Sequence, residues 1–97
     1  MNPDSPVKSV YVVDDDPGMR KSLGLLLAAT GFKVECFSSC EQFLDESDPE
    51  RGGCLVLDLH LAGMSGLDLL GFLRDRGSQL PVIFLTCLGG IQYAVDA

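Results

Sequence analysis

The sequence contains no tryptophan, a single histidine, and half as many basic as acidic side chains. Seven Lys and Arg residues stand against 14 Asp and Glu residues, which gives a net charge of −7 at pH 7. Because contacts with nucleic-acid phosphates need a basic surface, we expect no direct nucleic-acid binding by this chain. The acidity suits a cytoplasmic protein whose partners are proteins or cations.

The residues that build zinc sites and disulfide frameworks are also scarce. The chain has four cysteines without a CxxC pair and one histidine, at Cys36, Cys40, Cys54, Cys87 and His60. This spacing argues against a zinc site. The polar start of the chain is unlike a signal peptide, and no apolar run approaches the ~20 residues that span a bilayer. We therefore predict no membrane contact and reduced thiols in the cytoplasm.

Length and composition predict one small folded domain. The chain has 97 residues, of which 46% are apolar, enough for a single core. Residues 1–8 are polar and contain two prolines, and we interpret them as an N-terminal arm. The domain itself is expected to cover residues 9–97.

Three apolar runs each stop at an oxygen-bearing side chain. Continuous apolar runs that alternate with helical patterns are typical of parallel strands covered on both faces. In such sheets the ligand site lies beyond the carboxyl ends of the strands. The side chains that end the runs should therefore meet in one crevice that suits a cation and a phosphate. The three runs are 9–13, followed by Asp14, Asp15 and Asp16; 54–57, followed by Asp58; and 82–85, followed by Thr86.

The segments between these runs predict helices and one further strand. Asp16 followed by Pro17 is a strong helix start, and an apolar stripe then recurs at helical spacing. Right-handed crossovers through the helices make the order β-α-β-α-β-α-β-α a doubly wound α/β fold. The stripe consists of Met19, Leu23, Leu26 and Leu27, and the remaining elements are an edge strand at 33–37, a short helix from Ser39 to about 45, a helix capped by Ser65 and a last helical fragment at 91–97.

Three motifs in this order resemble a known family. Val-Val-Asp-Asp-Asp at 12–16, Leu-Asp-Leu-His-Leu-Ala-Gly-Met-Ser-Gly at 57–66 and Pro-Val-Ile-Phe-Leu-Thr at 81–86 are similar to a receiver domain of a two-component response regulator. The residues at 57–70 and 81–86 are most similar to those of the subgroup whose receivers precede a helix-turn-helix output domain. The resemblance covers roughly residues 9–97 and implies a flavodoxin-like doubly wound parallel sheet.

The resemblance also implies a role for individual residues. Asp58 matches the phosphoryl acceptor, and Thr86 matches the hydroxyl residue that contacts the phosphoryl group. Asp14 and Asp15 match the acidic pair that holds Mg²⁺, with Asp58 and the backbone carbonyl of His60 as further ligands. The donor would be a phosphohistidine on a sensor histidine kinase. Such a domain accepts a phosphoryl group and is not a turnover enzyme; it would regulate transcription through an output domain outside this sequence.

Elementary chemistry agrees with these roles. An aspartate with a reference pKa of about 3.9 is ionised at pH 7 and repels an incoming phosphoryl group. Further carboxylates nearby increase the repulsion, and a hard divalent cation with oxygen ligands relieves it. Asp16 is expected to cap the following helix rather than to bind the ion.

The chain departs from the family pattern at its end. Receivers continue into a fifth strand that ends in a lysine and then a fifth helix, whereas this sequence stops at Ala97. Without that strand, the edge of Val82–Leu85 should be unpaired, and unpaired apolar edges pair with other chains. We therefore expect an incomplete receiver domain that is either a fragment of a longer protein or a homodimer completing its sheet between chains through this edge.

Two alternatives to the signalling receiver remain open. The first is a shortened, non-switching receiver that serves as a kinase-docking or dimerisation module. The second is an enzyme, because Asp14-x-Asp16 at a strand end also fits the nucleophile and acid of haloacid-dehalogenase-like phosphatases, with Thr86 in their second motif. That reading leaves Asp58 without a role.

Overall fold

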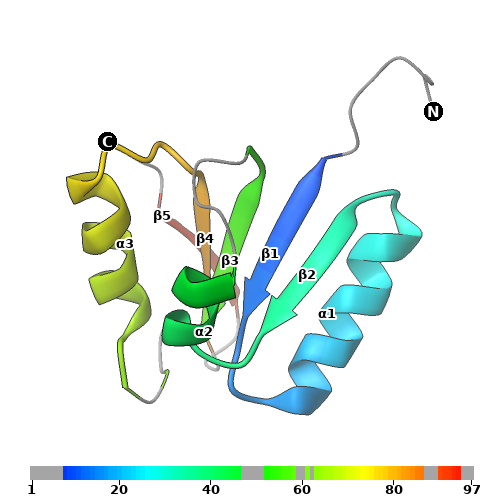
Figure 1. Ribbon diagram of the computed structural model, residues 1–97. Helices are drawn as coiled ribbons and strands as arrows, with labels where there is room; N and C mark the ends of the chain where they lie inside the picture. The colour runs from blue at the N-terminus through cyan, green and yellow to red at the C-terminus, as the bar shows by residue number, and fades with distance from the viewer. Residues whose placement is uncertain (1–7, 47–51, 59–60, 62, 87–89, 95–97) are drawn as a thin grey trace.

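Eight regular elements follow one another in the computed structural model, which describes residues 8–46, 52–58, 61, 63–86 and 90–94 (Figure 1). Helices alternate with strands up to the last pair of elements. In chain order they are β1 (Ser9–Val13), α1 (Pro17–Ala29), β2 (Lys33–Phe37), α2 (Cys40–Glu46), β3 (Cys54–Asp58), α3 (Gly66–Asp75), β4 (Val82–Thr86) and β5 (Gly90–Ala94). None of these helices is long and apolar enough to cross a membrane.

The strands form one sheet in the order β2-β1-β3-β4-β5. β2, β1, β3 and β4 are mutually parallel, so the predicted doubly wound α/β architecture is confirmed. β1 and β3 lie side by side in the centre, and four of the five residues in each are buried. Their continuous apolar sequences are what a strand covered on both faces requires. β2, which alternates Lys33 and Glu35 with apolar residues, lies at the predicted edge.

The two faces of the sheet carry separate apolar clusters. Side chains alternate between the faces along each strand, so Tyr11, Val13, Leu55 and Leu57 face one way and Val10, Val12 and Val56 the other. The larger cluster includes Phe43 from α2 and Leu69 and Leu73 from α3, all fully buried. α2 and α3 therefore cover one face, and α1 lies against the other (Figure 1).

Local sequence signals fix where the helices begin. Asp16 is the N-cap of α1, its side chain accepts a hydrogen bond from the Gly18 amide at 2.9 Å, and Pro17 opens the helix. Ser65 and Asp68 form a reciprocal capping box at the start of α3. Each cap satisfies amide groups that the first helical turn leaves without a partner. Both predicted helix starts are confirmed.

Asp16→Ala should destabilise the domain by about 1 kcal/mol, the usual cost of losing a side-chain N-cap. Asp16→Asn should leave the free energy of unfolding nearly unchanged, because an asparagine oxygen caps as well as a carboxylate does. Urea unfolding followed by circular dichroism measures both variants. Equal stability of the two would show that the bond to the Gly18 amide contributes nothing.

The apolar stripe predicted on α1 is only half buried in the structure. Leu23 and Leu27 pack against the cluster of Val10, Val12 and Val56. Met19 and Leu26 are 43% and 64% exposed, and α1 has no fully buried side chain. α1 packs on β1 and β2, and among the described residues no second helix lies on this face to cover its flank.

The end of the chain is the larger correction. The helical fragment predicted at 91–97 is wrong, because Gly90–Ala94 form β5, which pairs antiparallel with β4. The register runs from Thr86 opposite Gly90 to Val82 opposite Ala94. Glycine opens this segment, and Ile and Tyr favour strands, so the hydrogen bonds offered by β4 outweigh a weak helical pattern. The described residues still contain no fifth parallel strand.

The edge of Val82–Leu85 is therefore not open. Its backbone groups pair with β5 inside the same chain, and β5 is the edge strand. The homodimer predicted through this edge loses its structural basis, because an edge that is already paired offers no free hydrogen-bonding groups to a second copy.

Candidate functional site

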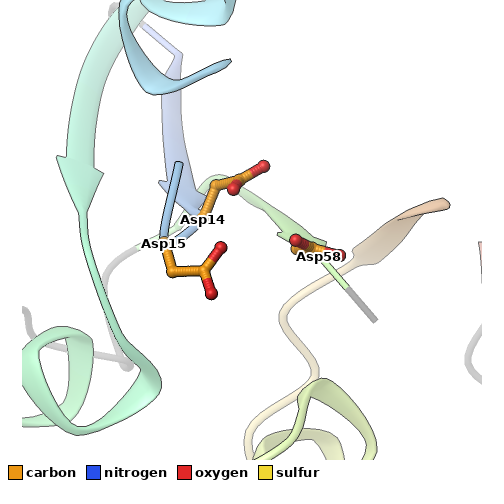
Figure 2. A group of neighbouring side chains, drawn as sticks. All are labelled: Asp14, Asp15 and Asp58. Atoms are coloured by element: carbon orange, nitrogen blue, oxygen red, sulfur yellow. The ribbon is translucent and has the colours of Figure 1, made fainter. Parts of the chain in front are cut away.

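Three carboxylates meet where β1 and β3 end. Asp14 and Asp15 follow β1 directly, and Asp58 is the last residue of β3. One carboxylate oxygen from each lies within 4.8 Å of the other two (Figure 2). The structure thus brings together side chains that lie more than 40 positions apart in the sequence, at the sheet edge where ligands of doubly wound folds bind.

Strand register explains why they meet. β1 and β3 are parallel neighbours, and Val13 lies opposite Leu57. The next residue on each strand is an aspartate, so Asp14 and Asp58 come out side by side. A shift of one position in either strand would turn one of the two carboxylates to the other face of the sheet. The buried apolar residues before each aspartate hold this register, since they fit the core in only one alignment.

Asp14 is held through both its backbone and its side chain. Its amide donates to the Phe37 carbonyl at 3.1 Å, and its Oδ1 accepts from the Asp16 amide at 2.9 Å. The residue is only 5% exposed. Burial raises the pKa of Asp14 above its usual value. The charges of Asp58 and Asp15 raise this pKa further, whereas the hydrogen bond from the Asp16 amide lowers it.

Asp15 and Asp58 differ in their access to solvent. Asp15 is exposed, while Asp58 is 9% exposed at the end of a buried strand. Asp14 and Asp58 therefore form the buried part of the cluster, and Asp15 forms its solvent-exposed part. A ligand can approach from the side of Asp15 and still contact all three carboxylates.

The donor set suits a hard divalent cation. Three carboxylates supply oxygen ligands, and Mg²⁺ takes such ligands while keeping several waters. Mutual repulsion within the cluster is part of what raises the pKa of Asp14, and a bound dication would remove that repulsion. Mg²⁺ therefore fits the chemistry of these residues.

The chain matches the model of a described family. Residues 10–97 match the family model of the response regulator receiver domain. The chain belongs to the receiver-domain family.

Solved and curated relatives agree with this assignment. The transcriptional regulatory protein FixJ of Azorhizobium caulinodans is 42% identical over 91% of this chain and 42% of FixJ. The structure of the response regulator StyR superimposes with a TM-score of 0.81 at 41% identity, over 93% of this chain and 46% of StyR. The structure of the response regulator TrrA of Thermotoga maritima, in complex with Mg²⁺-BeF, superimposes with a TM-score of 0.74 at 27% identity. The match covers 86% of this chain and 72% of the TrrA chain. The chain spans about two fifths of the length of the curated relatives it matches.

Two residues named from the resemblance cannot be placed by their side chains. His60, predicted to offer its backbone carbonyl, lies outside the described residues. Thr86 is the last residue of β4, and its side chain lies outside the described part as well. Its backbone position follows Leu85, which pairs with Asp58. Thr86 is thus one residue beyond the level of Asp58 on the neighbouring strand.

Two further charged residues of this receiver domain make contacts that were not predicted from the sequence. Arg20 in α1 donates from Nη1 to the Asp14 carbonyl oxygen at 2.8 Å. Glu41 in α2 accepts a hydrogen bond from the Met64 amide at 3.3 Å, in the connection that follows Asp58. Both are charged residues on helices, and nothing in their spacing distinguishes them from solvated surface residues.

Gly66 allows α3 to begin directly against the site. A Cβ added at Gly66 would lie 2.8 Å from Cε1 of Phe84 and 3.1 Å from the Asp58 carbonyl oxygen. The first distance is shorter than real Cβ atoms show, and the second is tighter than most Cβ contacts, so the neighbouring atoms would have to move. Glycine is thus required at position 66, because the Phe84 ring and the backbone of Asp58 lie too close to leave room for a side chain.

Gly66→Ala should destabilise the receiver domain by about 1–3 kcal/mol, the usual cost of overpacking. Gly71→Ala is the matched control in the same helix, because nothing lies within 4 Å of its added Cβ. It should raise stability by about 0.5–1 kcal/mol through helix propensity. Thermal unfolding of both variants measures the difference. A Gly66→Ala protein as stable as Gly71→Ala would contradict the close packing of α3 on Phe84.

Proposed function

We propose that this receiver domain takes a phosphoryl group from the phosphohistidine of a sensor histidine kinase onto Asp58. In the transfer, the P–N bond to the donor imidazole breaks and a P–O bond to the Asp58 carboxylate forms. The observation that carries the proposal is the meeting of Asp14, Asp15 and Asp58 at the ends of β1 and β3 (Figure 2). The product is an acyl phosphate on the protein, so one event changes the state of the domain and no substrate is turned over.

The residues that would hold Mg²⁺ are Asp14, Asp15 and Asp58, together with the backbone carbonyl of His60. When bound, the ion neutralises carboxylate and phosphoryl charge. The Thr86 hydroxyl is proposed to contact the transferred phosphoryl group. The structure of TrrA, a response regulator in complex with Mg²⁺-BeF, supports the proposal that the related fold of this chain holds Mg²⁺.

The contacts of Asp14 and Asp16 bear on the choice between a phosphoryl acceptor and a phosphatase. Asp14 Oδ1 already accepts from the Asp16 amide, and Asp16 Oδ1 accepts from the Gly18 amide as the cap of α1. A phosphatase of the haloacid-dehalogenase type would need Asp14 as nucleophile and Asp16 as acid. The Asp16 carboxylate is committed to a helix cap, which argues against that reading.

The wider role follows from relatives. FixJ is named a transcriptional regulatory protein, and the chain covers less than half of it. We propose that this receiver domain likewise controls transcription in the cytoplasm, through an output domain that contacts DNA on its behalf. Its acidic composition fits that division of labour, because a net charge of −7 disfavours direct contact with phosphates.

The direct test is intact mass after incubation with acetyl phosphate and MgCl2. We expect the mass of one phosphoryl group to be added with Mg²⁺ and not with EDTA. No uptake from acetyl phosphate or from a phosphorylated histidine kinase would instead favour the non-switching docking module. Magnesium-dependent turnover of a phosphomonoester would favour the phosphatase.

A further inference from the structure

Arg20 connects α1 to the acidic cluster through the protein backbone. Its Nη1 donates to the Asp14 carbonyl oxygen at 2.8 Å, in a partly buried position. A hydrogen bond from a charged donor is roughly twice as strong as one between neutral groups. The arginine therefore binds a residue of the cluster without contacting any of its carboxylates in the described contacts.

This contact completes a three-point hold on Asp14. The Asp14 amide donates to the Phe37 carbonyl, its carboxylate accepts from the Asp16 amide, and its carbonyl accepts from Arg20. The first bond joins two backbone groups, and the second needs only the carboxylate of Asp14 itself. The third depends on the side chain of another residue, so a substitution can remove it without changing any carboxylate of the cluster.

The carbonyl that Arg20 holds belongs to the peptide group between Asp14 and Asp15. A peptide group is planar, so fixing its carbonyl oxygen also fixes the direction of the Asp15 amide. Asp15 is exposed and follows the last residue that the sheet holds, so it has the most freedom of the three acidic residues. The orientation of that peptide group decides whether the Asp15 carboxylate faces Asp58.

We propose that Arg20 is a positioning residue for the metal site: it locks the Asp14–Asp15 peptide group so that both carboxylates face Asp58. The inference rests on the proposed function in one respect, namely that the cluster binds Mg²⁺. Arg20 acts through the backbone and is not a ligand.

The charge of Arg20 and its hydrogen bond to the Asp14 carbonyl should have opposite effects on Mg²⁺ affinity, so a substitution can tell them apart. A guanidinium near the cluster repels a dication, so loss of its charge alone would tighten Mg²⁺ binding. Loss of the lock would weaken it, and supporting hydrogen bonds behind metal ligands commonly account for 10-fold or more in affinity. We expect the loss of the hydrogen bond to outweigh the loss of the charge, because the bond is short, partly buried and charge-assisted. Mg²⁺ binding should therefore weaken.

The test is an NMR titration of the Asp14, Asp15 and Asp58 amides with MgCl2. Arg20→Met should weaken Mg²⁺ binding by about 10-fold. Lys21→Met is the matched control: it removes one charge from the next, exposed position of α1 and should leave the affinity within about 2-fold, since salt screens exposed charges. Arg20→Lys, which keeps the charge and a donor, should recover part of the loss.

A second readout needs no metal. In Mg²⁺-free protein, amide exchange at Asp16 reports on its bond to Asp14, and Arg20→Met should speed that exchange while Lys21→Met should not. Equal Mg²⁺ affinity of Arg20→Met and Lys21→Met, or a fall in unfolding temperature without a change in either readout, would overturn the proposal. If wild-type protein bound no Mg²⁺, the proposed function would fail and the exchange at Asp16 would still decide whether Arg20 positions Asp14.

Discussion

Asp58→Asn should abolish phosphoryl uptake by this receiver domain and leave its fold intact. The amide has nearly the size and shape of the carboxylate, so the end of β3 keeps its packing. An amide nitrogen is a far weaker nucleophile than a carboxylate oxygen, and Asp58 is the buried carboxylate at the end of β3. Intact mass after incubation with acetyl phosphate and Mg²⁺ should show no added phosphoryl group.

Asp16→Asn is the matched control for this result. It makes the same chemical change two residues beyond Asp14, and asparagine keeps the cap on the Gly18 amide. Uptake should persist in this variant at close to the wild-type level. Phosphoryl uptake by Asp58→Asn would refute the assignment of the acceptor, and loss of uptake in Asp16→Asn would revive the phosphatase reading.

Most of the sheet could be predicted because its signals are local. The apolar runs at 9–13 and 54–57 bury nearly every residue, which only a central strand allows. Helix starts were predictable for the same reason, since Asp16 and Ser65 cap the helices that immediately follow them. In these cases the residues that decide the structure are neighbours in the sequence.

The parts that could not be predicted depend on tertiary contacts. Gly90–Ala94 forms a strand because the edge of β4 is available, and no residue within 90–94 carries that information. Met19 and Leu26 have the spacing of buried residues but lie beyond the strands that α1 covers. Periodicity shows which residues share a helix face, but it does not show how much of that face the sheet covers.

The candidate site divides in the same way. Asp14, Asp15 and Asp58 could be placed together from strand ends alone, because parallel strands bring their carboxyl ends to one edge. The support around them could not be foreseen: Arg20 reaches the Asp14 carbonyl from a helix, and Gly66 matters because Phe84 lies against it. The meeting of the carboxylates follows from topology, whereas the contacts around them follow from packing.

Asp14→Asn should have opposite effects on stability with and without Mg²⁺. Burial, first of all, raises the pKa of Asp14, so the folded state holds its proton more tightly than the unfolded state does. Below the ordinary value of 3.8 both states are protonated, and the group contributes nothing to the pH dependence. As the pH rises past 3.8, the unfolded state ionises first and the free energy of unfolding falls until the folded group ionises too.

At pH 7 without Mg²⁺, the raised pKa of Asp14 means that its carboxyl group destabilises the folded state relative to the unfolded state, and Asp14→Asn removes this effect. The variant should be the more stable protein, and its advantage should shrink as the pH falls to 3.8. Asp45→Asn, at the exposed end of α2, controls for the general benefit of one charge fewer in an acidic chain.

Mg²⁺ should reverse the order of the two proteins. A ligand at 100 times its dissociation constant stabilises the folded state by about 2.7 kcal/mol, and each kcal/mol moves the unfolding temperature of a domain this size by about 4–8 °C. Wild-type protein should gain this stabilisation in saturating MgCl2, whereas Asp14→Asn, with one ligand charge lost, should gain little. Thermal unfolding at pH 7 with and without MgCl2 measures the crossing. Parallel shifts in both proteins would place the ion elsewhere, because a site built on Asp14 must lose its affinity through the same change that relieves the charge.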